Sequence, residues 1–345
     1  MSTLKSLLGV ELPVIQAPMA GAQDEQLAIA VARAGGLGSM PCALLTPAQL
    51  EKALHQFASL DSPVNLNFFC HAMAEPDAAR EQRWRDALMP YYREFGVEPP
   101  GVTAAGARRP IDEQTVDLLE FLPPKVVSFH FGLPDARLLR RIKAWGTLVL
   151  ASATTLDEGR WLERNGADVV IAQGIEAGGH RGHFLGNDLA PQPSTRQLVM
   201  QLRGAIGLPI VAAGGIGCAQ DAADLLEAGA CAVQAGTAYL LCPEATTSAV
   251  HRTALQYAPP RHTALTNLFS GRPARGIVNR LMRDLGALSD LPPEFPWASQ
   301  ALAPLRARAE ALGLGDFSPL WAGTGTKECR EVSAAQVTRM LAGME

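Results

Sequence analysis

The segment IAQGIEAGGHRG, residues 171–182, places one histidine, His180, among four glycines. Glycine carries no side chain, so its backbone can lie directly against a ligand. An imidazole gains and loses a proton near neutral pH, which suits it to acid–base chemistry. Two interpretations fit the segment: a flexible surface turn, or a site where the backbone and His180 close over a flat ligand.

Two further glycine-rich segments could hold a phosphate group. GGIG covers residues 214–217, and QAGT covers residues 234–237. Glycine N–H groups can approach phosphate oxygens closely, and the hydroxyl of Thr237 could add a donor. Each segment alone is also typical of a tight turn between a strand and a helix. Their occurrence in two successive strand-like runs favours a phosphate site.

Strand-like apolar runs alternate with helical segments along the first 240 residues. They cover residues 14–19, 37–43, 63–70, 125–132, 147–153, 168–174, 209–217 and 231–240. Runs such as VVI and IVAA are continuously apolar, as in parallel strands buried on both faces. The eight strand–helix units predict an α/β fold, a (β/α)8 TIM barrel. A doubly wound sheet is disfavoured because QAPMAG, and not G-x-G-x-x-G, ends the first strand.

The C-terminal third lacks this alternation. It contains the proline-rich turns PPRH and LPPEFPW, and helical pieces such as ASQALAPLRARAEAL. We predict a barrel over residues 1–245 and a C-terminal helical appendage, a mainly helical substrate-side domain, over residues 246–345. Residues 96–110, rich in Gly, Pro and Arg, predict an insertion loop within the barrel.

The strand ends offer groups suited to a flat ring, because functional residues of a barrel lie where its strands end. Ala17, Pro18 and Met19 provide small side chains and backbone groups as one wall. The amides of Asn67 and Gln173 can each donate and accept hydrogen bonds. A flavin isoalloxazine carries matching groups along its edge, so these residues predict a flavin whose phosphate lies at the glycine segments.

Seven motifs together resemble the class I nitronate monooxygenases, formerly called 2-nitropropane dioxygenases. They are QAPMAG, VNLNFFCH, SFHFG, AQGIEAGGHRG, AAGGIG, QAGTAYL and FSGRPARGI. The resemblance extends from about residue 10 to about residue 325, and AQGIEAGGHRG with FSGRPARGI is its most specific part. It implies an FMN-containing barrel that oxidises alkyl nitronates, notably propionate 3-nitronate, with O2 through a flavin semiquinone.

The resemblance also implies residue roles. His180 would be the base that takes a proton from a neutral nitroalkane, and His130 would lie across the same pocket. The expected cofactor contacts, including the wall residues, are Ala17, Pro18, Met19, Asn67, Gln173, Gly178, Gly179, Gly215, Gln234, Ala235, Gly236 and Thr237. A nitronate is already deprotonated, so FMN can take an electron from it while the protein positions and polarises the reactants.

One segment departs from the family pattern. Family members carry tyrosines and a lysine in the segment that matches EFPWASQALAPLR, and that segment lines their substrate pocket. Here the candidate positions hold Phe295, Ser299 and Ala303, with Trp297 nearby. We therefore expect a more apolar pocket and a larger or less polar substrate than propionate 3-nitronate.

The composition disfavours other classes of protein. The formal charge of −4, with both signs scattered, is unlike that of a nucleic-acid binder. No apolar run reaches the roughly 18 residues that span a bilayer, and the N-terminus lacks the features of a signal peptide. The cysteines form no C-x-x-C pair and the histidines no H-E-x-x-H motif. We expect reduced thiols, no metal and a cytoplasmic enzyme that acts on a small nitronate or nitroalkane and O2 and binds neither nucleic acid nor a membrane, with its oligomeric state left open.

Two alternative functions stay open. An NAD(P)H-dependent FMN reductase of the enoyl-acyl carrier protein reductase type would use the same barrel and similar glycine motifs. A non-catalytic flavin-binding protein would be yellow yet inert to nitronates, nitroalkanes and reduced pyridine nucleotides. A nucleotide-dehydrogenase barrel is disfavoured because no cysteine lies in a catalytic-looking loop.

Overall fold

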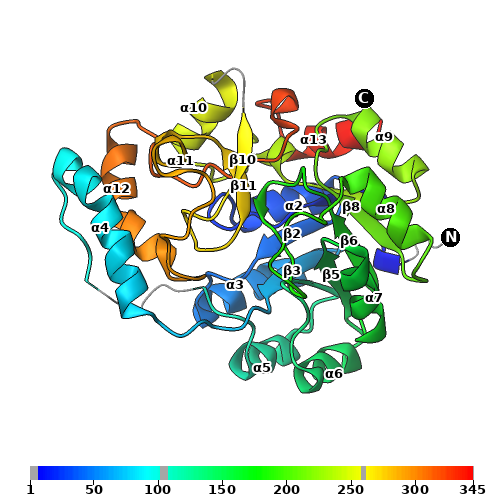
Figure 1. Ribbon diagram of the computed structural model, residues 1–345. Helices are drawn as coiled ribbons and strands as arrows, with labels where there is room; N and C mark the ends of the chain where they lie inside the picture. The colour runs from blue at the N-terminus through cyan, green and yellow to red at the C-terminus, as the bar shows by residue number, and fades with distance from the viewer. Residues whose placement is uncertain (1–6, 102–107, 258–261, 345) are drawn as a thin grey trace.

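Hydrogen bonds between the first two strands close the sheet into a barrel. The computed structural model describes residues 7–101, 108–257 and 262–344. Within them, eight parallel strands follow the order β1-β9-β8-β6-β5-β4-β3-β2. β1 (Val14–Gln16) meets Leu37, just before β2 (Gly38–Pro41), through N–H···O bonds of 2.9 Å in both directions. The predicted TIM barrel is confirmed (Figure 1).

The remaining barrel elements match the predicted strand–helix alternation. The strands are β3 (Val64–Phe69), β4 (Val126–His130), β5 (Leu148–Ala153), β6 (Val169–Gln173), β8 (Ile210–Ala213) and β9 (Ala232–Ala235). The surrounding helices are α2 (Glu25–Arg33), α3 (Pro47–Ala58), α5 (Glu113–Phe121), α6 (Ala136–Ala144), α7 (Leu156–Arg164), α8 (Thr195–Arg203) and α9 (Ala219–Glu227). Thr46 caps α3 and Pro47 occupies its first turn, as the sequence predicts.

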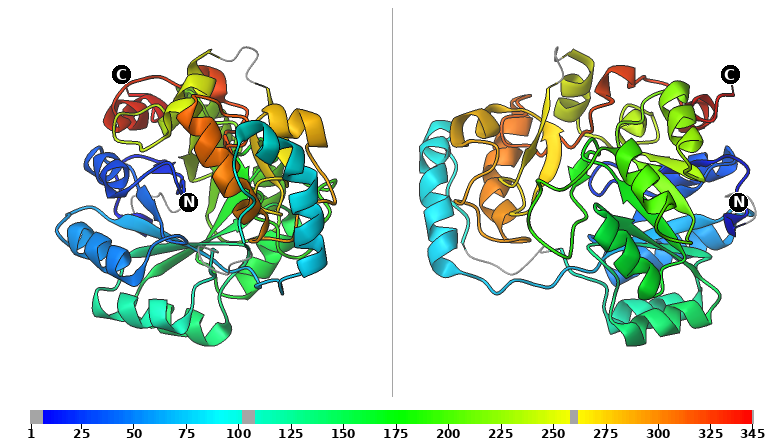
Figure 2. Two further views of the ribbon diagram at one scale, coloured as in Figure 1. Left: turned by 90° about the vertical axis from the view of Figure 1, so that its left-hand side faces the viewer. Right: turned by 45° about the vertical axis from the view of Figure 1, so that its right-hand side comes forward.

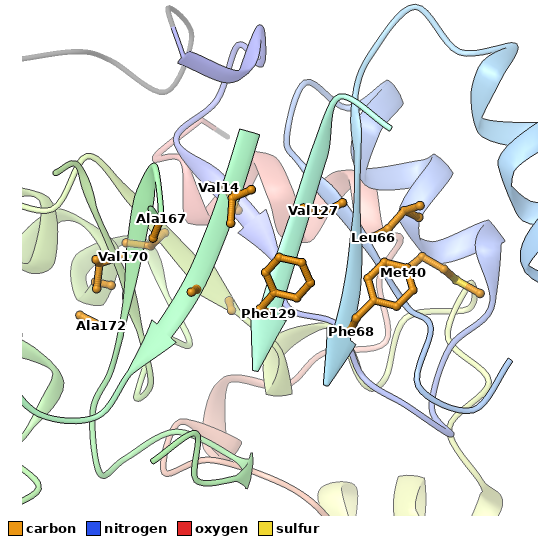
Figure 3. Close-up of a cluster of buried hydrophobic side chains, with 14 of the residues drawn as sticks. Val14, Met40, Leu66, Phe68, Val127, Phe129, Ala167, Val170 and Ala172 are labelled. Atoms are coloured by element: carbon orange, nitrogen blue, oxygen red, sulfur yellow. The ribbon is translucent and has the colours of Figure 1, made fainter. Parts of the chain in front are cut away.

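The strands are buried on both faces because alternate side chains serve two different cores. Val127 and Phe129 of β4 belong to the large cluster that the strands form with the outer helices (Figure 3). Val126 of the same strand belongs to a second cluster with Leu150 and Ile171 of neighbouring strands. This double burial explains the continuously apolar runs in the sequence.

A separate hydrophobic core lies beside the barrel. Here α4 (Ala78–Phe95) packs against α12 (Ala298–Ala311), and the two views of Figure 2 place both helices at the same end of the molecule. Trp84 of α4 donates its indole N–H to the carbonyl of Ala298 at 3.1 Å. This lobe, which also includes α11 (Arg280–Leu285), therefore takes one helix from the N-terminal half of the chain.

A helix from the C-terminal end of the chain belongs, in turn, to the barrel side. α13 (Ala334–Leu341) packs on α2 and α9 of the barrel. The division at residue 245 stays a prediction.

The C-terminal third is not purely helical. Besides α10 (Ala249–Tyr257), it contains β10 (Thr263–Thr266) and β11 (Ala274–Ile277), which form an antiparallel hairpin. β11 also pairs with β7 (Gly179–His180), so that Ala274 lies opposite His180. The motif FSGRPARGI thus supplies the strand that holds the glycine-rich loop. The 3-10 turn η2 (Thr326–Glu328) also lies in this region, whereas η1 (Thr237–Tyr239) directly follows β9 of the barrel.

Two other sequence expectations meet the structure here. In the predicted insertion loop, residues 97–101 and 108–110 are irregular, and residues 102–107 lie outside the described residues. Among the helices of the described ranges, none combines the length and apolar character needed to cross a membrane.

Removing the indole of Trp84 should destabilise the protein because this side chain is part of the hydrophobic core of the lobe. Trp84 is 1% exposed, so Trp84→Ala leaves a cavity and removes the indole hydrogen bond to the carbonyl of Ala298. We expect the free energy of unfolding to fall by about 3–5 kcal/mol in urea titrations followed by circular dichroism. Phe121 is 84% exposed, and Phe121→Ala should cost less than about 0.5 kcal/mol. Equal losses in the two variants would contradict the second core.

Candidate active site

The carboxyl ends of the barrel strands open into a cavity of about 290 Å³. Loops that follow the strands and part of the helical lobe complete its walls. All of the predicted site residues line it: Ala17, Pro18, Met19, Asn67, His130, Gln173, Gly178, Gly179, His180, Gly215, Gln234, Ala235, Gly236 and Thr237. The sequence therefore located the site, while the role of each residue stays a prediction.

His180 lies where the barrel meets the lobe. Its Nε2 atom is 2.8 Å from the hydroxyl of Ser270. The rings of Phe295 and Trp321 flank the imidazole, with centroids at 5.4 and 5.6 Å. Burial holds the pKa of His180 well below its usual value, and the positive charge of Arg108 lowers it further. The imidazole is therefore neutral at physiological pH and able to accept a proton.

The backbone of His180 is held by two side chains from the barrel. Gln173, at the end of β6, donates from Nε2 to the carbonyl of His180 at 2.9 Å and accepts from Gly182 N–H at 2.8 Å. His130, at the end of β4, places Nε2 at 3.2 Å from the same carbonyl and Nδ1 at 3.0 Å from Ser152 Oγ. Burial lowers the pKa of His130 to about 3, so its neutral ring donates from Nε2 and accepts from Ser152.

The buried side chain of Arg181 holds the glycine-rich loop in place. Arg181 is 0% exposed and donates to the carbonyls of Gln173 and Gly174 at 2.8 and 2.7 Å. Its Nε donates to Gln192 at 2.8 Å. Glu176 accepts from the N–H and hydroxyl of Thr195, both at 2.9 Å. These contacts exclude the interpretation of this loop as a flexible surface turn.

Gly178 permits a close approach between two backbone segments. A Cβ atom at this position would lie 2.5 Å from Gly323 N and 2.6 Å from the carbonyl carbon of Ala322. The same Gly323 N–H donates to the hydroxyl oxygen of Thr237 at 2.9 Å. The segment around Gly323 therefore links the glycine-rich loop to the end of β9.

Several polar groups of the cavity have no partner within the described part of the chain. They include the N–H groups of Gly215 and Ile216 and the carbonyl oxygen Oε1 of Gln234, which is buried. Thr237 accepts from Gly323 and still has its hydroxyl proton to donate. Asn67 uses Nδ2 to contact Ser128 Oγ at 3.0 Å, and its Oδ1 has no described partner. The arrangement leaves donors near Gly215 for an anion and amide acceptors for a ligand with N–H groups.

The cavity carries positive charge that the sequence did not reveal. The charge comes from Arg108 and Arg306, because burial lowers the pKa values of the three lining histidines, His130, His180 and His251, and keeps them neutral. No Asp or Glu is among the described lining residues. Arg108 comes from the irregular insertion and His251 from α10. Neither residue lies in a sequence motif that indicates a site. Such a cavity favours anionic ligands.

The substrate-side segment differs from the expectation of an apolar pocket. Phe295 contacts His180, but Ser299 and Ala303 do not line the cavity. Ala303 is exposed, and Arg306, one helical turn later in α12, lines the cavity instead. The orientation of α12, which its packing against α4 determines, therefore decides which residues of this segment reach the site.

Comparison with known proteins agrees with this architecture. The family model for nitronate monooxygenase matches residues 1–342. The chain belongs to the nitronate monooxygenase family. It is 42% identical to a nitronate monooxygenase of Pseudomonas aeruginosa, over 97% of this chain and 96% of the relative. The family assignment makes the chain an enzyme, a flavin-dependent oxidoreductase, and supports oxidation of nitronates.

Two solved structures share the fold of this nitronate monooxygenase family member. A nitroalkane oxidase from Streptomyces ansochromogenes superposes with a TM-score of 0.88 at 36% identity, covering 99% of this chain and 97% of its own. FabK from Thermotoga maritima superposes with a TM-score of 0.71 at 25% identity, covering 99% and 96%. The resemblance stated from the motifs is confirmed.

Gly178→Ala should separate the glycine-rich loop from the segment around Gly323. Because the new methyl group would meet backbone atoms, neither side can move away cheaply. We expect a lower melting temperature and less flavin absorbance per purified chain. At Gly186, in the same connection, a new methyl group would have nothing within 4 Å, so Gly186→Ala is the matched control. Normal flavin content in Gly178→Ala would contradict the prediction.

Proposed function

We propose that this chain binds FMN in the cavity and oxidises alkyl nitronates of the propionate 3-nitronate type with O2. The observation that carries the proposal is the combination of a neutral, buried His180 with a cavity that contains arginines and lacks described carboxylates. A nitronate is an anion, and a cavity with this charge favours its binding over that of a cation. Family membership supports the same reaction.

The unpartnered groups fit FMN. The N–H groups of Gly215 and Ile216 and the hydroxyl of Thr237 would hold the phosphate, because all three can donate to its oxygens. Asn67 Oδ1 and Gln234 Oε1 would accept from N–H or hydroxyl groups of the cofactor. Gly236 and the wall of Ala17, Pro18 and Met19 offer little side-chain bulk beside it. Bound FMN supplies electron acceptance from the nitronate and reaction with O2.

The side chains of the site would prepare the substrate. His180, neutral because it is buried, would accept the proton from the carbon next to the nitro group of a neutral nitroalkane. Arg108 would hold an anionic substrate by charge-assisted hydrogen bonds. Phe295 and Trp321 would restrict the orientation of the His180 ring. A preformed nitronate would need binding and orientation but no base.

His180→Asn should separate the two kinds of substrate. With a neutral nitroalkane, we expect kcat/KM to fall at least about 100-fold, because the base is lost. With a preformed nitronate, kcat/KM should stay within about tenfold of the wild-type value. In the wild type, the lowered pKa of His180 keeps the base deprotonated, so activity on the nitroalkane should persist down to about pH 6.

The cofactor test uses the purified yellow protein under anaerobic conditions. Addition of propionate 3-nitronate should change the flavin absorbance within one turnover, and O2 should restore it. Bleaching by NADH or NADPH without any change on addition of a nitronate would favour the pyridine-nucleotide reductase instead. No change with any of these compounds would favour a non-catalytic flavin-binding protein.

Arg108→Gln should weaken the binding of an anionic substrate. The loss of a charge-assisted hydrogen bond costs about 1.5 kcal/mol or more, so KM for propionate 3-nitronate should rise about tenfold or more. We expect kcat to change by less than about twofold, because FMN performs the oxidation step. Arg109 is exposed and does not line the cavity, so Arg109→Gln is the matched control. Equal KM values for the two variants would show that Arg108 does not bind the substrate.

A further inference from the structure

The hydroxyl of Ser270 contacts three groups that together use all of its hydrogen-bonding capacity. Ser270 is 2% exposed and lies in the turn before β11. Its Oγ atom is 2.8 Å from His180 Nε2, accepts from the N–H of Arg272 at 3.4 Å and donates to the carbonyl of Arg272 at 3.2 Å. A hydroxyl has one proton and two lone pairs. If its proton goes to the Arg272 carbonyl, its remaining lone pair must accept a proton from His180 Nε2.

The opposite proton arrangement makes fewer hydrogen bonds. If Ser270 donated to an unprotonated Nε2, its only proton would leave the Arg272 carbonyl. That carbonyl has no other donor within the described ranges of the chain. Arg272 is partly buried, and in that arrangement its carbonyl would lose its described donor, so the contacts favour the ring that carries its proton on Nε2.

The second ring nitrogen of His180 is left for chemistry. Nδ1 has no hydrogen-bond partner among the described residues, and His180 lines the cavity. We propose that Ser270 is a positioning residue that fixes the tautomer of His180, so that Nδ1 is the atom that takes the substrate proton. This role deepens the proposed function and rests on it.

The proton transfer moves one proton and one electron pair. The C–H bond next to the nitro group breaks, and its electron pair forms the C=N bond of the nitronate. The proton forms a bond to Nδ1, and His180 becomes an imidazolium whose Nε2–H still donates to Ser270. Ser270 itself neither gains nor loses a proton in this step.

The first test measures the tautomer directly in the holoenzyme. Long-range nitrogen–proton NMR correlations of protein labelled with 15N-histidine should show a wild-type His180 protonated on Nε2. The signal is assigned by its absence in His180→Asn. Ser270→Ala should give a mixture of both tautomers. A wild-type ring protonated on Nδ1 would overturn the proposal, and this result does not depend on any activity.

The second test compares kinetics with two substrates. Ser270→Ala should lower kcat/KM for a neutral nitroalkane about tenfold and change that for a preformed nitronate by less than about twofold. Ser270→Thr retains the hydroxyl and should recover most of the loss. Ser289 is the matched control, because its Oγ accepts from Leu291 N–H at 3.2 Å with the same residue spacing and contacts no histidine. Ser289→Ala should behave as wild type.

The outcomes separate this proposal from the proposed function. Unchanged nitroalkane kinetics in Ser270→Ala, with normal nitronate oxidation, would overturn the role of Ser270 alone. A wild-type enzyme that oxidises no nitronate would overturn the proposed function, and the NMR result would still decide the tautomer. If Ser270→Thr fails to fold, the wild-type and Ser270→Ala spectra still decide between the two tautomers.

Discussion

The carbonyl oxygen of His180 accepts hydrogen bonds from two barrel strands, through Gln173 of β6 and His130 of β4. His180 also belongs to the two-residue strand β7, which pairs on its other side with β11 of the lobe hairpin. His180 is therefore held between two parts of the chain that are each stabilised by their own hydrophobic core. The orientation of its imidazole depends on how the lobe packs on the barrel, because Ser270 and Phe295 belong to the lobe side.

The position of β7 between the barrel and the lobe hairpin explains the many glycines of residues 171–182 better than closeness to a cofactor alone. Gly178 lies against the backbone around Gly323, and Gly179 has a φ of +72°, in the left-handed region that favours glycine. Both features let β7 turn toward the hairpin directly after β6. The loop can then offer His180 to the cavity while Arg181 fixes its other side in the protein interior.

The barrel and the location of the site could be predicted from the sequence. Parallel strands buried on both faces give continuous apolar runs, and the ends of such strands meet at one edge of a barrel. For this reason, residues as distant as Asn67 and Gln234 could be assigned to one site. The sequence also predicts Gln173 at the flavin edge, because an amide both donates and accepts hydrogen bonds. In the structure both ends of that amide already bind the loop backbone, a partnership that depends on how the loop folds back.

The remaining features depend on contacts that leave no local pattern. β7 has two residues, too few for any periodicity, and its partner strand β11 begins only at Ala274. The bond between His180 and Ser270 spans 90 residues, and Arg108 lies in an insertion without regular structure. α4 has an ordinary amphipathic sequence, and nothing in it indicates that it packs against α12.

Charge and burial act together on the chemistry of the site. An ionised histidine in this cavity would face the guanidinium of Arg108 without a described carboxylate to compensate, so burial and charge both keep His180 neutral. A neutral imidazole has one basic nitrogen, and the tautomer decides which one it is. In the proposed reaction, the imidazolium and the nitronate would form an ion pair in the same enclosure once the substrate proton is taken. The negative charge of the nitronate would then offset the repulsion between the imidazolium and Arg108, and this compensation would make proton transfer to a histidine of lowered pKa favourable.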